Sequence, residues 1–438
     1  MMTLIENPLL QTRLPIQLDQ ESELVAQFTE ATSEVGIYSD RTAVVNFYVA
    51  LKSRPLMILT GPEKSGKIAL VRCLARSLMG GDCPQYQMLV GHPWSSEKSD
   101  NIALFTQAQT SLTSEKLLSL IEEAWHPENT HRLYIACITR LSPAELLSFF
   151  TEVSYQLRNG ELMQFGDVHF SEPLPFPPNL FLIGTMDTPH FDLWNKDLLS
   201  NATVVHWPKA GLLTRTYLKR DFSSQESEFL RSCTRNRQAV YHKIHAILGW
   251  QRQPLRPLVE IEAVLQDHNI QFSDSLIDEA MVYLANSWSS QGNGLFDPST
   301  SRNLEIALDL AIAQTILPHT ADAMQRNPVL REELLAVLSG QFPRSAAFIS
   351  ALANRYQDGL IGETIEYDSS TYLRKDVRFM VKDLVCGMEI DPKTAAGQSD
   401  YMGQTYYFCS LGCKKAFDKE PEKYVKVQGH ASEHGHHH

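Results

Sequence analysis

Short apolar runs alternate with amphipathic stretches over the first half of the chain. Apolar positions between Tyr38 and Leu51 predict a helix, and the run Leu56–Thr60 predicts a buried strand that ends at Gly61. Four further strands are expected, at 87–90, 132–138, 180–185 and 203–206. Helices are expected between the strands, near 66–79, 114–125 and 142–157. Because strands and helices alternate, the pattern favours an α/β fold, a mostly parallel sheet with helices on both faces.

From residue 220 to about 355 the pattern is helical only, which predicts a second, helical domain. Its helices are expected near 226–250, 275–288, 302–317, 329–338 and 345–356. The Gly- and Pro-rich stretch 159–179 predicts a hairpin insertion. The expected segments are an N-terminal arm (1–37), the α/β domain (38–215), the helical domain (216–357), a linker (358–381), a small α+β cysteine module (382–427) and a His-rich tail (428–438).

The composition is that of a folded protein of several domains. The chain has 438 residues, of which 43% are hydrophobic, and a net charge of −12. This charge, without a long Lys/Arg run, argues against nucleic-acid binding, because phosphate backbones would be repelled. No apolar run reaches the ~18 residues that a membrane span needs, and the N-terminus lacks a signal-peptide pattern. We expect a cytoplasmic protein with no membrane partner, and the odd cysteine count favours a reducing compartment.

A phosphate-binding loop is indicated at the end of the first predicted strand. Residues 61–67, GPEKSGK, match the pattern G-x4-G-K between a predicted strand and a predicted helix. Backbone N–H groups and the helix N-terminus of such a loop hold nucleotide phosphates, and Lys67 adds a positive charge. The alternative is a surface turn with a solvated lysine. The candidate nucleotide-binding residues of this loop are Gly61, Pro62, Glu63, Lys64, Ser65, Gly66, Lys67 and Ile68.

Three side chains depart from what nucleotide hydrolysis requires. Ile68 stands where a Ser or Thr hydroxyl normally binds Mg²⁺. Ala136 and Cys137 stand in the strand 132–138, where an Asp-Glu pair is expected to bind the metal and polarise water. An isoleucine, an alanine and a cysteine cannot replace these groups, so a Mg²⁺ cofactor is doubtful.

Further motifs occur in a fixed order along residues 38–319. Residues 90–94 (VGHPW) are similar to V-x-P-x-W, and residues 183–188 (IGTMDT) are similar to IGTMNT. Residues 307–318 (ALDLAIAQTILP) are similar to a lid-helix segment. With the loop and the segment ITRLSPAELLSFFTEV, this span resembles the McrB/MoxR-type branch of the AAA+ ATPases. The resemblance implies a P-loop AAA+ sheet with a helical lid, binding of ATP or GTP, and assembly into a ring.

Two further departures concern residues that this family uses for hydrolysis. Asp187 replaces the sensor-1 Asn, which in the family orients the attacking water. Residues 198–202 (LLSNA) stand where the family carries an arginine finger. Arg302 is a candidate sensor-2 residue that would touch nucleotide from the lid, or else an exposed helix arginine. No catalytic residue is assigned, and the degenerate positions are Ile68, Ala136, Cys137 and Asp187.

A second candidate site lies near the C-terminus. Cys386 is followed after 22 residues by Cys409, and three residues separate Cys409 from Cys413. Two cysteines on one helical turn and a distant third can hold a soft metal. Residues 383–424 resemble a YHS domain of the TRASH-like class, with Tyr406, Tyr407, Phe408 and Phe417 as expected core aromatics. The resemblance implies Zn²⁺ or Cu⁺ bound by Cys386, Cys409 and Cys413.

Alternatives remain for this module and for the tail after it. The three cysteines could be reduced core residues, and no fourth metal ligand is evident from the sequence. The tail carries His430, His434, His436, His437 and His438. These histidines fit a low-selectivity metal-binding tail or a purification tag.

Three functions follow as hypotheses. The first is a pseudo-ATPase, a nucleotide-binding regulatory or scaffold subunit with weak or no hydrolysis, coupled to the metal-binding module. The second is an active ATPase that remodels a partner, with replacement ligands from Glu63, Glu145, Asp187 or a neighbouring subunit. The third is a metal-sensing or metal-trafficking protein in which the AAA+ part is a structural carrier. The expected partners are proteins, including an AAA+ ring or an active paralogue.

Overall fold

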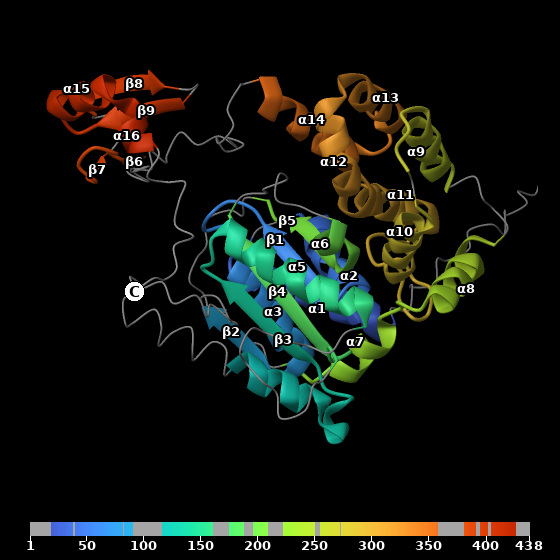
Figure 1. The fold of residues 1–438 in the computed structure, drawn as a ribbon. Coiled ribbons are helices and arrows are strands. Elements are labelled where there is room, and N and C mark those ends of the chain that lie inside the picture. The colour runs from blue at the N-terminus through green and yellow to red at the C-terminus, as the bar shows by residue number, and fades with distance from the viewer. Residues whose placement is uncertain are drawn as a thin grey trace, which may run out of the picture. The chain divides into compact units, whose positions relative to one another are not determined.

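The computed structural model describes residues 19–37, 40–81, 83–90, 116–160, 175–187, 196–208, 222–249, 255–271, 273–357, 381–390, 395–401 and 404–425 (Figure 1). Its contacts divide the chain into two units, 1–365 and 366–438. Among these residues no helix has the length and apolarity needed to cross a bilayer. The predicted hairpin, the linker and the His-rich tail lie wholly or largely outside the described residues, as do residues 91–94.

A five-stranded parallel sheet forms the framework of the first unit (Figure 1). Its strands lie in the order β2-β3-β4-β1-β5, and every neighbouring pair is parallel. The strands are β1 (Leu56–Thr60), β2 (Tyr86–Val90), β3 (Tyr134–Thr139), β4 (Leu180–Met186) and β5 (Ala202–His206). β1, β3 and β4 are buried along their whole length, as expected for apolar runs in a sheet covered on both faces. The α/β prediction and its five strands are confirmed.

Two hydrophobic cores lie on opposite faces of this sheet. Alternate strand residues point to opposite faces, so Met57 and Cys137 belong to one core while Ile58 and Ala136 belong to the other. The first core includes α2 (Arg41–Ser53) and α3 (Lys67–Met79). The second includes the helical residues 116–125, α5 (Pro143–Asn159) and α6 (Lys196–Asn201). Helices therefore cover both faces, as predicted.

Residues 1–37 were expected to form an arm with no regular secondary structure. Much of this segment is instead a helix, α1 (Gln20–Glu34). Asp19 caps this helix, and Leu24 and Phe28 lie four residues apart on its buried face. Glu21 of the same helix is buried in an ion pair with Lys52. This helix was not predicted, although its buried apolar residues Leu24, Val25, Phe28 and Ala31 recur at helical spacing.

The described residues between 222 and 357 form helices and their connections, as predicted. The predicted helix 226–250 is two helices, because the Asn236 side chain accepts the N–H of Ala239 and starts a new one. Helices α9 (Arg256–Asp267) and α12 (Leu317–Arg326) were not predicted, and a π-helical turn (Ile312–Ile316) joins α11 (Thr300–Ala311) to α12. The helices are α7 (Glu226–Ser232), α8 (Arg237–Leu248), α9 (Arg256–Asp267), α10 (Asp274–Asn286), α11 (Thr300–Ala311), α12 (Leu317–Arg326), α13 (Pro328–Leu338) and α14 (Pro343–Gln357).

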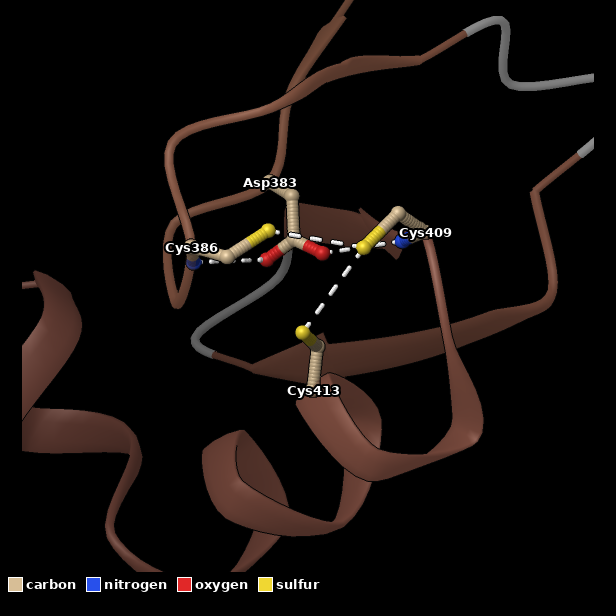
Figure 2. A group of neighbouring side chains, drawn as sticks. All are labelled: Asp383, Cys386, Cys409 and Cys413. Atoms are coloured by element: carbon tan, nitrogen blue, oxygen red, sulfur yellow. Dashed lines mark hydrogen bonds between the residues drawn. The ribbon is translucent and has the colours of Figure 1, made fainter.

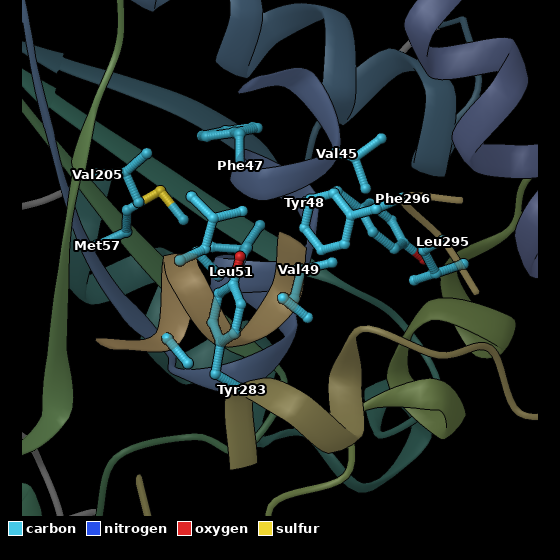
Figure 3. Packing of buried hydrophobic residues seen from close by; sticks show 14 of the residues in the cluster. Val45, Phe47, Tyr48, Val49, Leu51, Met57, Val205, Tyr283, Leu295 and Phe296 are labelled. Atoms are coloured by element: carbon cyan, nitrogen blue, oxygen red, sulfur yellow. The ribbon is translucent and has the colours of Figure 1, made fainter. Parts of the chain in front are cut away.

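Helix α2 joins the sheet to these helices. Figure 3 shows Phe47 and Leu51 of α2 in one cluster with Met57 and Val205 of the sheet and with Tyr283 of α10. All five side chains are buried. The helical part is therefore attached to the sheet through a continuous core.

The described residues of the second unit form two antiparallel strand pairs and two helices. Its core is aromatic: the ring of Phe417 lies 5.0 Å from the rings of Tyr406 and Phe408, centroid to centroid. Of the four aromatics expected in this core, Phe408 and Phe417 are buried, whereas Tyr406 and Tyr407 are both half-buried. The elements are β6 (Val381–Lys382), β7 (Glu389–Ile390), β8 (Gly397–Tyr401), β9 (Gln404–Phe408), α15 (Leu411–Lys419) and α16 (Pro421–Val425).

Candidate functional site

The three predicted cysteines of the second unit come together around one carboxylate. The potential ligand atoms of Asp383, Cys386, Cys409 and Cys413 all lie within 4.8 Å of one another (Figure 2). The sulfur of Cys409 is 3.4 Å from that of Cys386 and 3.7 Å from that of Cys413. The four groups come from the turn after β6, the end of β9 and the first turn of α15. Segments separated by more than twenty residues thus converge at one point.

Asp383 holds the two halves of this cluster together. One carboxylate oxygen accepts the N–H groups of Val385 at 2.9 Å and Cys386 at 3.4 Å, and the other accepts the N–H of Cys409 at 2.8 Å. Burial alone would raise the pKa of Asp383, but hydrogen bonds, first from Cys409 and then from Val385, lower it to about 2. The side chain is buried and ionised at neutral pH. Its hydrogen bonds fix where the backbone places Cys386 and Cys409.

Local turns point the cysteines toward each other. Gly387, with a φ of 78°, donates its N–H to the carbonyl of Asp383 at 2.7 Å and closes a tight turn around Cys386. Ser410 caps α15 by accepting the N–H of Cys413 at 3.1 Å. Cys413 therefore lies in the first helical turn, where the helix dipole favours a negatively charged thiolate.

The donor set fits a thiophilic metal ion. Cys386 is exposed while Cys409 and Cys413 are half-buried, so the cluster is accessible from solvent on one side. In the thiol form, the hydrogen bond with the Asp383 side chain and then that with Cys386 raise the pKa of Cys409 to about 12. A bound cation would displace this proton, because metals bind cysteine as thiolate. Metal–sulfur bonds of about 2.3 Å are compatible with the sulfur separations found here.

Asp383 was not among the residues predicted from the sequence. The signal for it was present, since an Asp three residues before a Cys can form an Asx-type turn with its backbone. What the sequence did not show is its bond to Cys409, which depends on the folded position of β9.

The predicted phosphate loop lies between β1 and α3, with a backbone that glycine makes possible. A Cβ on Gly61 would lie 2.1 Å from the carbonyl oxygen of Trp207, so a larger residue does not fit there. Gly66 and Lys64 have positive φ angles of 88° and 60°. The indole of Trp207 donates to the carbonyl of Ser65 at 3.0 Å and fixes the other end of the loop.

Lys67 points back into this loop. Its side chain is only 7% exposed, and its ammonium donates to the carbonyls of Gly61 and Pro62, at 2.7 Å each. It also pairs with the carboxylate of Asp187 at 3.2 Å. Burial lowers the pKa of Lys67, and the Asp187 charge partly opposes that effect. The lysine is therefore held by internal acceptors in the structure.

Of the degenerate positions outside the loop, Asp187 is the one whose side chain pairs with Lys67. Ala136 and Cys137 are fully buried within β3 and belong to the cores on opposite faces of the sheet. Burial raises the pKa of Cys137 to about 12. Ile68 is the second residue of α3 and is half-buried. Neither residue of β3 is placed to bind a metal beside the loop.

The remaining nucleotide-site candidates lie elsewhere. Arg302 is 65% exposed in the first turn of α11, where it pairs with Glu305 at 3.2 Å. Glu145, an alternative metal ligand, closes a capping box at the start of α5 by accepting the N–H of Ser142 at 2.9 Å. Residues 198–202, expected to lack an arginine finger, form the end of α6 and the start of β5.

Comparison with known families gives two partial matches. Residues 239–359, within the helical part of the first unit, match a family described as "Domain of unknown function (DUF8727)". A search of curated proteins finds no match to the chain. Neither result supports the resemblance of residues 38–319 to AAA+ ATPases, and the identity of the sheet as a P-loop AAA+ domain is not confirmed. The second match is the YHS domain, over residues 381–428. The C-terminus of this chain is a YHS domain that carries a cluster of three cysteines and one aspartate.

Proposed function

We propose that the YHS domain binds one thiophilic transition-metal ion, Zn²⁺ or Cu⁺, through Cys386, Cys409 and Cys413. The observation that carries this proposal is the convergence of these three sulfurs with Asp383 inside 4.8 Å. Thiolates are the ligands that both ions favour, and isolated structural cysteines have no need to converge.

Asp383 acts in this proposal as a positioning residue. Both of its oxygens already accept backbone N–H groups, so its main contribution is to orient the cysteines around the ion. The accessible side at Cys386 leaves room for a fourth ligand from solvent or from a partner. This arrangement favours a metal-sensing or metal-trafficking role for the module.

Metal titration of the full chain tests the proposal. The five tail histidines, residues 430, 434 and 436–438, are first changed to serine so that they cannot bind metal. Co²⁺ should then bind at one equivalent with strong thiolate-to-cobalt absorption, and Zn²⁺ or Cu⁺ should displace it. Cys413→Ser should weaken binding by at least about tenfold, whereas Cys233→Ser, in the first unit, should leave it unchanged. The absence of thiolate-to-cobalt absorption in the tail-altered protein would contradict the proposal.

A second candidate function is nucleotide binding by the first unit with weak or no hydrolysis. It is supported by the loop at the carboxyl end of β1, where a glycine-rich turn leads into α3 and a buried lysine points inward. Ligands of parallel α/β sheets bind at this edge. Arg302, which is exposed and paired with Glu305, would serve this candidate only by leaving that partner for the nucleotide. In this proposal the first unit is a regulatory or scaffold part, alone or in a ring with an active paralogue, coupled to the metal-binding module.

Hydrolysis separates this candidate from an active ATPase that remodels a partner. Weak turnover is expected because Ile68 offers no hydroxyl to Mg²⁺ and because Ala136 and Cys137 are buried and carry no carboxylate. Phosphate release from ATP and GTP, with and without Mg²⁺, should stay at background in the wild type. Mg²⁺-dependent turnover that Lys67→Ala abolishes would favour the active enzyme, with Glu63 or Asp187 as replacement ligands.

A further inference from the structure

The Lys67–Asp187 ion pair lies where two neighbouring strands leave the sheet. β1 and β4 are paired in parallel, with Thr60 opposite Met186. The next residues, Gly61 and Asp187, therefore emerge side by side at the same edge. Lys67 lies in the first turn of α3, and its side chain extends back to this edge of the sheet. Its ammonium lies 3.2 Å from the Asp187 carboxylate.

All three N–H donors of the Lys67 ammonium have acceptors in this arrangement. The carbonyls of Gly61 and Pro62 take two of them, and Asp187 is the only charged acceptor that contacts the ammonium among the residues described here. In phosphate-binding loops the corresponding lysine serves the β- and γ-phosphates of a nucleotide. Asp187 thus supplies the negative charge that a phosphate group would otherwise bring to Lys67.

We propose that Asp187 makes this loop select nucleoside diphosphates over triphosphates, an inference that rests on the nucleotide-binding proposal above. A diphosphate can be held by the loop N–H groups while Lys67 keeps its carboxylate partner. A triphosphate adds negative charge beside the same lysine, where it must displace Asp187 or lie against it. The Asp187 side chain is 54% exposed, so it can rotate away from Lys67. Its negative charge nevertheless stays close to the loop.

The residues around the loop give little compensation for that added charge. Sites that bind nucleoside triphosphates offset the charge of the third phosphate with Mg²⁺, which a loop hydroxyl and a strand carboxylate hold. Ile68 provides no hydroxyl, and the buried Ala136 and Cys137 provide no carboxylate. Glu63, which is exposed on the loop, adds a further negative charge near Lys67.

Calorimetric titration of the full chain with ADP, ATP, GDP and GTP, with Mg²⁺ and with EDTA, tests this inference. The wild type should bind the diphosphate of the preferred base at least about tenfold more tightly than its triphosphate. Asp187→Asn should strengthen triphosphate binding by about tenfold and change diphosphate binding by less than about threefold. Lys67→Ala should weaken the binding of both, because it leaves the Asp187 carboxylate beside the phosphates without its cation.

A matched control and two contrary outcomes complete the experiment. Asp322→Asn removes an exposed carboxylate of α12 and should leave both affinities unchanged. Triphosphate binding equal to or tighter than diphosphate binding in the wild type would overturn the selectivity while leaving nucleotide binding intact. Binding of no nucleotide by the wild type, with the fold verified by circular dichroism, would overturn both proposals.

Discussion

The carboxylate of Asp383 accepts the backbone N–H of Cys409 at 2.8 Å, although 26 positions separate the two residues. This bond joins the turn that carries Cys386 to the residue that directly follows β9. The arrangement of the three cysteines therefore depends on Asp383, whose carboxylate oxygens both accept backbone N–H groups.

Asp383→Asn is expected to weaken metal binding by about 10- to 100-fold without removing any cysteine. The amide NH₂ that replaces one oxygen cannot accept an N–H, so one half of the site loses its anchor. Competition with a chelator of known affinity measures the effect. Asp400→Asn, an exposed change in β8 of the same domain, should behave like the wild type.

The metal-free YHS domain should lose stability in strong acid through Asp383. The folded pKa is about 2, below the ordinary value of 3.8, so the ionised form stabilises the fold. That stabilisation is present above about pH 4 and is lost as the pH falls from about 4 toward about 2. An NMR titration of the Asp383 side-chain carboxyl carbon should show a midpoint near 2, and a midpoint near 4 would contradict the hydrogen-bonded arrangement.

Metal binding should stabilise the second unit selectively. A free metal concentration 100 times the dissociation constant adds about 2.7 kcal/mol to the free energy of unfolding. The rates of amide hydrogen exchange that depend on unfolding of residues 381–425 should fall about 100-fold, which corresponds to that free energy. All six tryptophans precede residue 366, so the tryptophan-fluorescence unfolding transition should not move. A metal-dependent shift of that transition would contradict the prediction, because it would show that metal binding also stabilises the first unit.

Breaking the buried Glu21–Lys52 pair from one side should be costly. Both side chains are fully buried, and Glu21 also accepts the hydroxyl of Tyr48 at 3.2 Å. Lys52→Met leaves the carboxylate without its cation and should lower the free energy of unfolding by about 3–5 kcal/mol. The double change Glu21→Gln with Lys52→Met should cost less than the two single changes together, by about 0.5–3 kcal/mol, in urea denaturation.

Gly61→Ala should disrupt the loop more than a glycine change elsewhere. The added methyl would meet the carbonyl of Trp207 at 2.1 Å, and the φ of 147° disfavours a side chain. We expect the free energy of unfolding, measured by urea denaturation, to fall by about 2–4 kcal/mol, because the backbone at Trp207 would have to move. Gly160→Ala, at a φ of 63° with no atom within 4 Å of the new Cβ, should cost only about 1 kcal/mol.

Much of the secondary structure could be predicted because it depends on local pattern. The strand Leu56–Thr60 was predicted from four consecutive apolar residues and a threonine that lead into Gly61, and the strand found has the same bounds. The helix α1 was missed although its local pattern is present, with Asp19 as the cap and Leu24, Val25 and Phe28 at helical spacing; what no local pattern showed is the burial of Glu21 against its distant partner Lys52. The break before Arg237 was also missed, since a single capping residue, Asn236, decides it.

The sequence by itself determined the cysteine spacing, the loop motif and the alternation that makes an α/β sheet, because each is a short-range pattern. Only the tertiary structure decided which of these groups meet. Asp383 reaches Cys409 because of how the turn after β6 lies against β9. Lys67 meets Asp187, 120 positions later, because β1 and β4 are neighbours in parallel register. Such contacts are set by the pairing of distant segments, and no local pattern of residues encodes that pairing.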